Sequence, residues 1–171
     1  MPATYEPIAT TTLGSTTSTI TFSSISSAYT DLVISIFCQN AAATTGTRTG
    51  VLTINGDTGT NYSTTQLRGD GASATSTRST SSSSIFYAEI PRIGSGTNLF
   101  AHSRISFFNY AGSTNKTLLC ENSADLNGSG FVVRNVGLWR NTAAITSITL
   151  AGGAEGFTTG TTATLYGILK A

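Results

Sequence analysis

The stretch from residue 48 to residue 67 reads Arg-Thr-Gly-Val-Leu-Thr-Ile-Asn-Gly-Asp-Thr-Gly-Thr-Asn-Tyr-Ser-Thr-Thr-Gln-Leu. Its residues 51–55 are rich in β-branched side chains and alternate with a period of two, which predicts a strand. Asn55 and Gly56 tolerate the positive φ angles of a tight turn, and the chain then extends again from Tyr62 onward. The stretch therefore predicts a β-hairpin. Because an isolated hairpin is only marginally stable, this one must belong to a larger sheet.

The composition of the 171-residue chain favours β structure within a single domain. Threonine contributes 32 residues and serine 22, whereas charged residues make up only 10% of the chain. Threonine suits a pleated surface, and the helix formers Glu, Lys and Met are scarce. The formal net charge is +1 without a basic or acidic block, so we expect neither a nucleic-acid partner nor a membrane partner. A surface with so little charge suits a protein that works within an assembly.

Alternating apolar residues predict short strands along most of the chain. The strand over residues 31–39 has apolar side chains on both faces, which indicates a central strand covered from two sides. Residues 72–84 have no apolar periodicity and predict either a mobile surface loop or an irregular edge. The remaining strands are expected near residues 19–22, 85–90, 100–110, 117–121, 131–139, 145–150 and 162–170. About ten strands without a helix predict an all-β fold, an antiparallel β-sandwich that is jelly-roll-like, with a barrel as the alternative.

The first residues differ from the rest of the chain. Pro2 and Pro7 flank Tyr5, and each proline pushes the residue before it toward extended geometry. We therefore expect an extended N-terminal arm over residues 1–7 that contacts a partner, followed by one sandwich domain over residues 8–171. The start of the chain lacks the basic and apolar segments of a secretory signal, so we expect synthesis in the cytoplasm of the producing cell.

The residues that could carry chemistry are isolated from one another. His102 is the one histidine, and no second ligand stands at zinc-site spacing from it. Asp57 and Asp70 lie in glycine-rich turns without the dense oxygen ligands that calcium needs. No nucleophile elbow, phosphate-binding loop or dinucleotide motif occurs. We therefore expect a protein that is not an enzyme and that binds no metal or cofactor.

Cys38 and Cys120 lie within apolar, strand-like segments, where a free cysteine behaves as a small buried hydrophobic residue. A disulfide between them is the alternative, and an origin in the cytoplasm disfavours it. We therefore expect two free thiols in the core.

Two further features have both a structural and a functional interpretation. Trp139 and several tyrosines could stack on sugars, although packing in the core or at an interface is the interpretation that we favour. Arg68-Gly69-Asp70 spells a tripeptide that resembles integrin ligands, and we interpret it as a chance occurrence in a turn.

Five segments are distinctive when they are taken together: residues 29–35 (Tyr-Thr-Asp-Leu-Val-Ile-Ser), 54–63 (Ile-Asn-Gly-Asp-Thr-Gly-Thr-Asn-Tyr-Ser), 105–110 with the Asn-Lys-Thr at 115–117, 145–150, and 164–168. With these segments the chain resembles a group of tailed-bacteriophage virion structural proteins, from about residue 5 to its end. The resemblance implies a β-sandwich module on the outside of the particle, without enzymatic activity. It also implies a homotrimer.

The resemblance leaves two functions open. In the first, the chain is a capsid decoration, or cement, protein on the outer capsid surface, which binds the major capsid protein through Pro2, Tyr5 and Pro7 and stabilises the shell. In the second, it is a tail-fibre or receptor-binding module that recognises host-surface glycans, with Trp139 as a stacking residue. We favour the cement protein, because the chain carries no repetitive fibre shaft.

Overall fold

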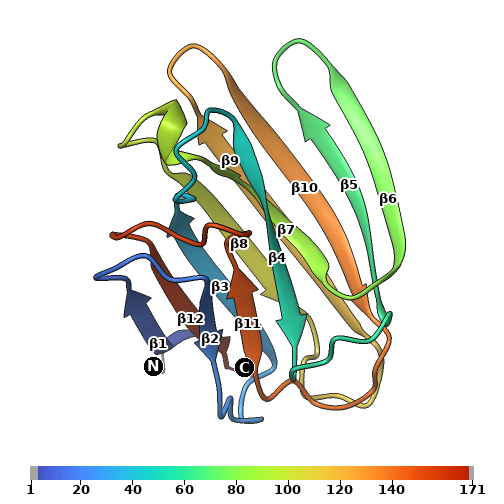
Figure 1. Cartoon of the computed structure of the whole chain (residues 1–171). Helices are drawn as coiled ribbons and strands as arrows, with labels where there is room; N and C mark the ends of the chain where they lie inside the picture. The colour runs from blue at the N-terminus through green and yellow to red at the C-terminus, as the bar shows by residue number, and fades with distance from the viewer. Residues whose placement is uncertain (1–3, 170–171) are drawn as a thin grey trace.

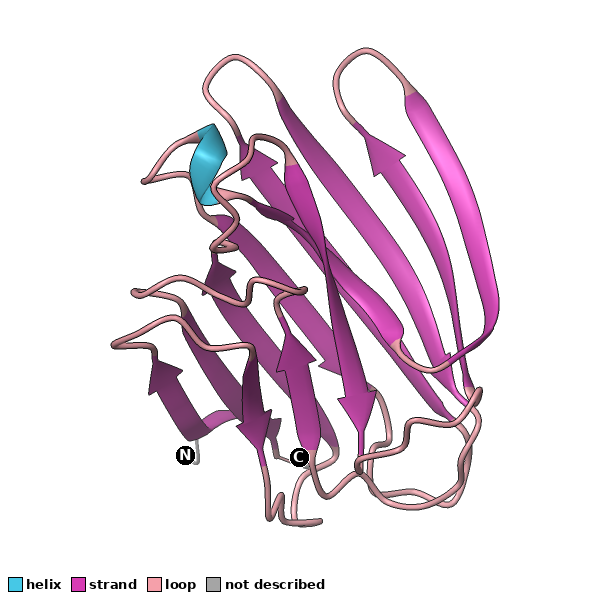
Figure 2. Ribbon diagram, in the orientation of Figure 1, coloured by secondary structure: helices cyan, strands magenta, loops and turns pink. Residues whose placement is uncertain are grey.

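The computed structural model describes residues 4–169, which form an all-β chain (Figure 1, Figure 2). The one helical segment in this range is a single 3-10 turn over Ile93–Ser95. The sequence predicts about ten strands, and the structure adds two, β1 and β6. The twelve strands are β1 Tyr5–Thr12, β2 Thr19–Phe22, β3 Asp31–Cys38, β4 Thr47–Ile54, β5 Tyr62–Gly69, β6 Ala74–Ser82, β7 Ile85–Pro91, β8 Ala101–Phe107, β9 Lys116–Asp125, β10 Gly130–Trp139, β11 Ile148–Ala151 and β12 Thr162–Ile168.

The strands form two sheets that pack face to face (Figure 1). The large sheet has eight strands in the order β1-β12-β3-β8-β9-β10-β5-β6, and the small sheet has four in the order β2-β11-β4-β7. Every pairing between neighbouring strands is antiparallel. Both sheets keep open edges within the described residues. The predicted antiparallel β-sandwich is therefore confirmed, and the barrel alternative is wrong.

The alternation of side chains along the strands builds the core between the sheets. In β3, Leu32, Ile34 and Ile36 are fully buried on the inner side, as the period of two requires. Phe37 points to the other side of the sheet and stays half exposed. The expectation that this strand is covered from both sides holds at Val33, which lies on the outer side and is 4% exposed, and it is wrong at Phe37, which the ring of Phe100 covers only in part.

The predicted hairpin over residues 48–67 is wrong as a hairpin, although both of its strands exist. β4 belongs to the small sheet and β5 to the large one, so the segment between them crosses from one sheet to the other. Asn55 and Gly56 do have positive φ angles of 53° and 67°. The hydroxyl of Tyr62 accepts a hydrogen bond from the backbone N–H of Ile54 and donates to the carbonyl of Asp57, which ties the start of β5 to the end of β4.

Two segments that the sequence assigns to irregular structure are edge strands of the large sheet. β6 lies within residues 72–84, for which the sequence predicts a loop or an irregular edge, and it pairs with β5 from Ala74 to Ser82 with one break in register. The edge alternative therefore holds, and the loop alternative is wrong. Threonine and serine form a strand here because the sheet neighbour, rather than a core, supplies the hydrogen bonds. The predicted arm is also wrong for Tyr5 and Pro7. Both residues lie in β1, where they pair with Ile168 and Tyr166 of β12. Proline is tolerated there because β1 is an edge strand.

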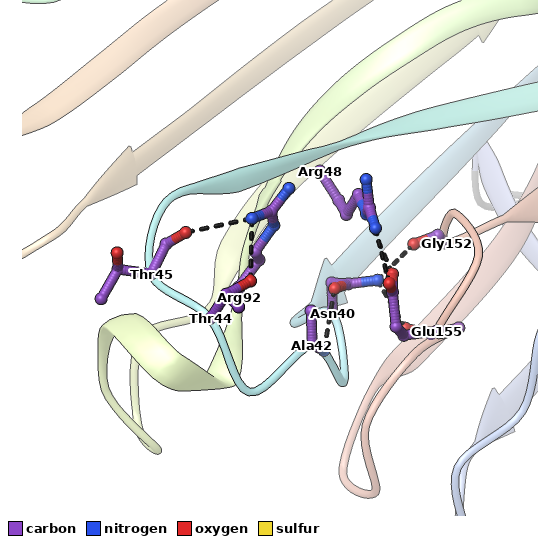
Figure 3. A network of polar contacts seen from close by, with 9 residues as sticks. Asn40, Ala42, Thr44, Thr45, Arg48, Arg92, Gly152 and Glu155 are labelled. Atoms are coloured by element: carbon purple, nitrogen blue, oxygen red, sulfur yellow. Dashed lines mark hydrogen bonds and ion pairs between the residues drawn. The ribbon is translucent and has the colours of Figure 1, made fainter.

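A buried asparagine holds the loops at one end of the sandwich (Figure 3). The side-chain amide of Asn40 donates to the carbonyls of Gly152 and Gly156 at 2.7 and 2.9 Å. Its side-chain oxygen accepts the backbone N–H of Ala42 at 3.0 Å. Close by, the guanidinium of Arg48 donates to the carboxylate of Glu155. These contacts connect the loop after β3 to the loop before β12.

Candidate interaction face

The outer side of the large sheet is the most distinctive surface of the described chain, and we call it the outer face. Side chains from all eight strands of this sheet point away from the core, and many of them are exposed, although Val33 is covered. Several of these side chains are large and apolar, with exposed fractions between 45% and 64%: Tyr5, Phe37, Leu67, Val132 and Val136. A cluster of exposed apolar side chains on one face is typical of a surface that binds another molecule.

Strand register brings part of this apolar set together. Arg134 lies opposite Leu67 in the pairing of β10 with β5, so Val132 and Val136 are the diagonal neighbours of Leu67 on the same face. The guanidinium of Arg134 is paired with the carboxylate of Glu121 on the next strand. The charge within the cluster is thus neutralised internally. Because both partners are well exposed, this ion pair contributes little to stability.

Two adjoining hollows lie on the outer face. The first, of about 800 Å³, lies beside the turns that join β5 to β6 and β9 to β10, and Phe37, Phe100 and His102 form part of its lining. The second, of about 520 Å³, extends over Leu67, Arg104 and Glu121. Both hollows include Gly69, His102, Ser123 and Val132, so they form one continuous groove across the strands.

The first hollow combines an aromatic wall with polar groups. The rings of Phe37 and Phe100 are stacked, with centroids 4.8 Å apart and planes at 12°. His102 lies on the strand next to Phe37, and its Nε2 is 2.9 Å from the hydroxyl oxygen of Ser35. This single contact orients the imidazole ring. Among residues 4–169, no group of histidine, cysteine or carboxylate side chains is arranged to hold a metal ion.

The residues predicted to contact the capsid have different positions in the structure. Pro2 lies outside the described residues. Tyr5 and Pro7 lie on the outer face at the β1 edge, where the hydroxyl of Tyr5 accepts a hydrogen bond from Arg104 at 3.0 Å. The ring of Tyr5 also meets that of Tyr166 edge to face, with centroids 6.4 Å apart. Tyr5 and Pro7 are therefore part of the same surface as the apolar cluster, at its opposite margin.

Trp139 packs in the core, which is the interpretation that we favour from the sequence, and its burial does not fit the sugar-stacking role that the alternative function gives it. Its side chain is 1% exposed, and its indole N–H donates to the carboxylate of Asp57 at 2.8 Å. Asn61 donates to the same carboxylate, and this pair of donors, with Trp139 first, holds the pKa of Asp57 below its usual range. Trp139 thus holds the segment that crosses from β4 to β5. Residues 54–63, which are distinctive in the sequence, include this segment and therefore have a structural role.

The charges of the Arg68-Gly69-Asp70 tripeptide are used within the chain. The guanidinium of Arg68 pairs with the carboxylates of both Asp70 and Glu89 at 2.8 Å. Asp70 also accepts hydrogen bonds from the backbone N–H groups of Ser73 and Ala72, which close the turn between β5 and β6. The Ser73 N–H and Arg68 lower the pKa of Asp70 to about 2. These contacts support the interpretation of the tripeptide as part of a turn.

Both cysteines are free and fully buried, which confirms the sequence prediction. Burial raises the pKa of each thiol to about 12, so both remain protonated and unreactive at neutral pH. Within the described residues no helix has the length and hydropathy needed to span a membrane. Comparisons with protein-family models, with curated proteins and with solved structures find no match to this chain.

The sequence reasoning missed the outer face, although the sequence contains the signal. In residues 131–139, both alternating sets of side chains include apolar residues, Phe131 and Val133 in one set and Val132 and Val136 in the other. A strand with one solvated face normally shows polar residues in the second set. An apolar second set therefore indicates a further covering layer, and the described chain supplies none.

Proposed function

We propose that the chain is a structural protein of a tailed-bacteriophage virion, and specifically a decoration protein that binds the outer capsid surface and cements neighbouring capsid subunits. The observation that carries the proposal is the outer face, on which apolar side chains stand exposed over a sheet of eight strands. The low charge of the chain and its resemblance to phage virion proteins support the same conclusion. The expected partner is the major capsid protein.

The proposed mechanism is linkage and needs no chemistry. A protein that binds the assembled shell, and not its dissociated subunits, stabilises the shell by an amount set by affinity and occupancy. The apolar centre of the contact would consist of Leu67, Val132 and Val136. Its margin would include Tyr5 and Pro7. The internally paired Arg134 and Glu121 would form a polar element within it.

The copy number of the chain tests this function. We expect quantitative mass spectrometry of purified virions to give a ratio to the major capsid protein near one, or a simple fraction that matches lattice positions. A ratio of a few per cent or less would contradict the cement function and assign the chain to the tail.

A pair of charge substitutions tests the contact surface. Leu67→Lys together with Val132→Lys should weaken rebinding of the purified protein to stripped capsids by about tenfold or more, because two ammonium groups would have to be desolvated. Thr19→Lys, on the exposed side of the small sheet, adds the same kind of charge away from the outer face and should leave binding unchanged. Equal weakening by both changes would exclude the outer face as the contact.

The first hollow favours a second candidate function, a tail-fibre or receptor-binding module that recognises host-surface glycans. Its stacked Phe37 and Phe100, flanked by His102 and hydroxyl side chains, combine an apolar platform with hydrogen-bonding groups, as sugar sites do. This function predicts binding on an array of bacterial surface polysaccharides that is lost in Phe37→Ala. Phe108→Ala removes another exposed ring outside the hollow and should retain binding. Absence of binding by the unmodified protein would exclude it.

A further inference from the structure

The two sheets have four edges within the described residues, and three of them carry features that block the addition of another strand. β1 contains Pro7 and a break in register between Pro7 and Ala9. β2 is only four residues long. β7 has a break in register at Tyr87 and ends at Pro91. These are the devices by which natural sheets prevent edge-to-edge association.

β6 is different, because most of its length has no such protection. Six consecutive residues, from Ala74 to Ser79, pair with β5 in unbroken register. The segment contains no proline, and its one charged side chain is Arg78. The register breaks only beyond Ser79, where Ser81 has a φ of 53°. In Figure 1, β6 forms the right-hand margin of the molecule, and no described segment pairs with its free side.

We propose that the free edge of β6 binds the β6 strand of a second copy of the chain, antiparallel and about a two-fold axis perpendicular to the sheet. Six residues at about 3.4 Å each would give a paired edge about 20 Å long. The large sheets of the two copies would then become one continuous sheet, and their outer faces one continuous surface. This inference stands independently of capsid binding.

The charge pattern of β6 selects the register of the pair. In an antiparallel pair about such an axis, residues that face each other must lie on the same side of the sheet. An axis centred on Ser76 or Thr77 satisfies this condition and places Arg78 opposite Ala74 or Ser76. An axis centred on Arg78 would place two guanidinium groups opposite each other, which is destabilising. The favoured registers are therefore those centred on Ser76 or Thr77.

The side chains of β6 favour a second copy as the occupant. Elsewhere in the chain, hydroxyl side chains pair across strands: Thr10 with Thr164, Thr12 with Thr162 and Thr21 with Thr149, at 3.0 to 3.1 Å. From Ala74 to Ser79, β6 contains only Ala, Ser, Thr and Arg78, so two copies of it can form the same kind of hydroxyl contacts. A net charge of +1 leaves little repulsion between copies.

The protection of the other edges also selects two copies over three. A closed ring of three would require each copy to use two different edges, one for each neighbour. β1, β2 and β7 are all unsuited to that role. A two-fold pair uses the same edge in both copies and leaves no further β6 edge open. The inference therefore differs from the homotrimer that the resemblance implies.

Sedimentation equilibrium of the full chain tests the proposal. We expect a two-chain species at about 10 µM. Ser76→Lys should raise its dissociation constant tenfold or more in either register, because the lysine would face a second lysine or Arg78 of the other copy. Ser76→Glu should raise the dissociation constant if the axis is centred on Ser76, where two carboxylates meet, and lower it if the axis is centred on Thr77, where each carboxylate faces Arg78. In the register centred on Ser76, a mixture of the two variants should restore the pair, since a lysine then faces a glutamate. Amide protons of β6 should exchange more slowly at high protein concentration than at low concentration.

Ala9→Lys is the matched control, because it places a lysine on the opposite edge of the same sheet at an exposed position. It should leave association unchanged, and circular dichroism should show that all variants keep the fold. A monomer at these concentrations, or a trimer, would overturn the proposal. So would a two-chain species that Ser76→Lys leaves intact.

Discussion

Asn40 is fully buried, and three of its hydrogen-bonding positions are satisfied by backbone groups of two loops (Figure 3). A buried amide is costly when it lacks partners, so the loops and the side chain must be ordered together. Asn40 thus has the role that a core residue has elsewhere, at an end of the sandwich where the loops carry little apolar surface.

Replacing Asn40 with alanine should lower the free energy of unfolding by about 2–4 kcal/mol, because it leaves the carbonyl of Gly152 and the N–H of Ala42 without this partner and removes one of the two hydrogen bonds to the carbonyl of Gly156. Urea denaturation measures the change. Asn98→Ala is the control, because Asn98 is exposed, and it should cost less than about 0.5 kcal/mol. Equal effects of the two changes would show that the Asn40 contacts contribute nothing.

The buried thiols predict how stability depends on pH on the alkaline side. Burial raises the pKa of Cys38 and Cys120 from 9.0 to about 12 in the folded chain, whereas the unfolded chain ionises near the ordinary value. Above pH 9 the unfolded state therefore releases protons that the folded state retains. The free energy of unfolding should fall toward pH 12 by about 1.4 kcal/mol per pH unit for each thiol.

Chemical denaturation between pH 7 and pH 11 checks this dependence. The double variant Cys38→Ala and Cys120→Ala should be less stable at pH 7, because it leaves small cavities, but its stability should decline less steeply above pH 9. Some decline should remain, because burial also raises the pKa of Tyr87. An unchanged slope in the double variant would show that the thiols do not control it.

Among the elements, the segment that crosses from β4 to β5 depends on backbone geometry at Gly56. The φ angle of Gly56 is +67°, and the space around its Cβ position is empty. The Cβ position of Gly14 is equally free, and its φ is not positive. A comparison of the same substitution at the two glycines therefore isolates the effect of the left-handed conformation at Gly56.

We expect Gly56→Ala to destabilise the chain by about 1–2 kcal/mol, the cost of the left-handed conformation for an L-residue. Gly14→Ala should be neutral or stabilising by up to about 1 kcal/mol, because it restricts the unfolded chain. Thermal denaturation of both variants gives the comparison. Destabilisation of the same size at Gly14 would contradict the role assigned to the turn.

The elements also show where sequence reasoning succeeds. Strand positions such as residues 31–39 were predictable, because alternation records which side faces a core. The hairpin at residues 48–67 was not, because Asn55-Gly56 specifies a turn and says nothing about which sheet receives the next strand. For β6 the sequence leaves a loop and an irregular edge open, because an edge strand with two solvated faces has no apolar period. The outer face could have been inferred from the doubled apolar pattern of residues 131–139.

At the scale of the whole molecule, the two sides of the large sheet have different roles. The inner side packs on the small sheet and holds the fold together, as at Leu118 and Leu165, which are fully buried. The outer side exposes apolar side chains that the fold does not need, and it lies next to the free β6 edge. The proposed function assigns this surface to binding rather than to stability.

This division predicts opposite results for the two sides. Replacing Leu67, Val132 and Val136 together with threonine should change the free energy of unfolding by less than about 1 kcal/mol, because threonine suits strands and little buried area is lost. Leu118→Thr, a single change on the inner side, should cost about 2–4 kcal/mol by leaving a cavity and burying a hydroxyl. Urea denaturation measures both. A large loss from the triple variant would mean that the outer face stabilises the chain itself, and the binding function assigned to it would lose its basis.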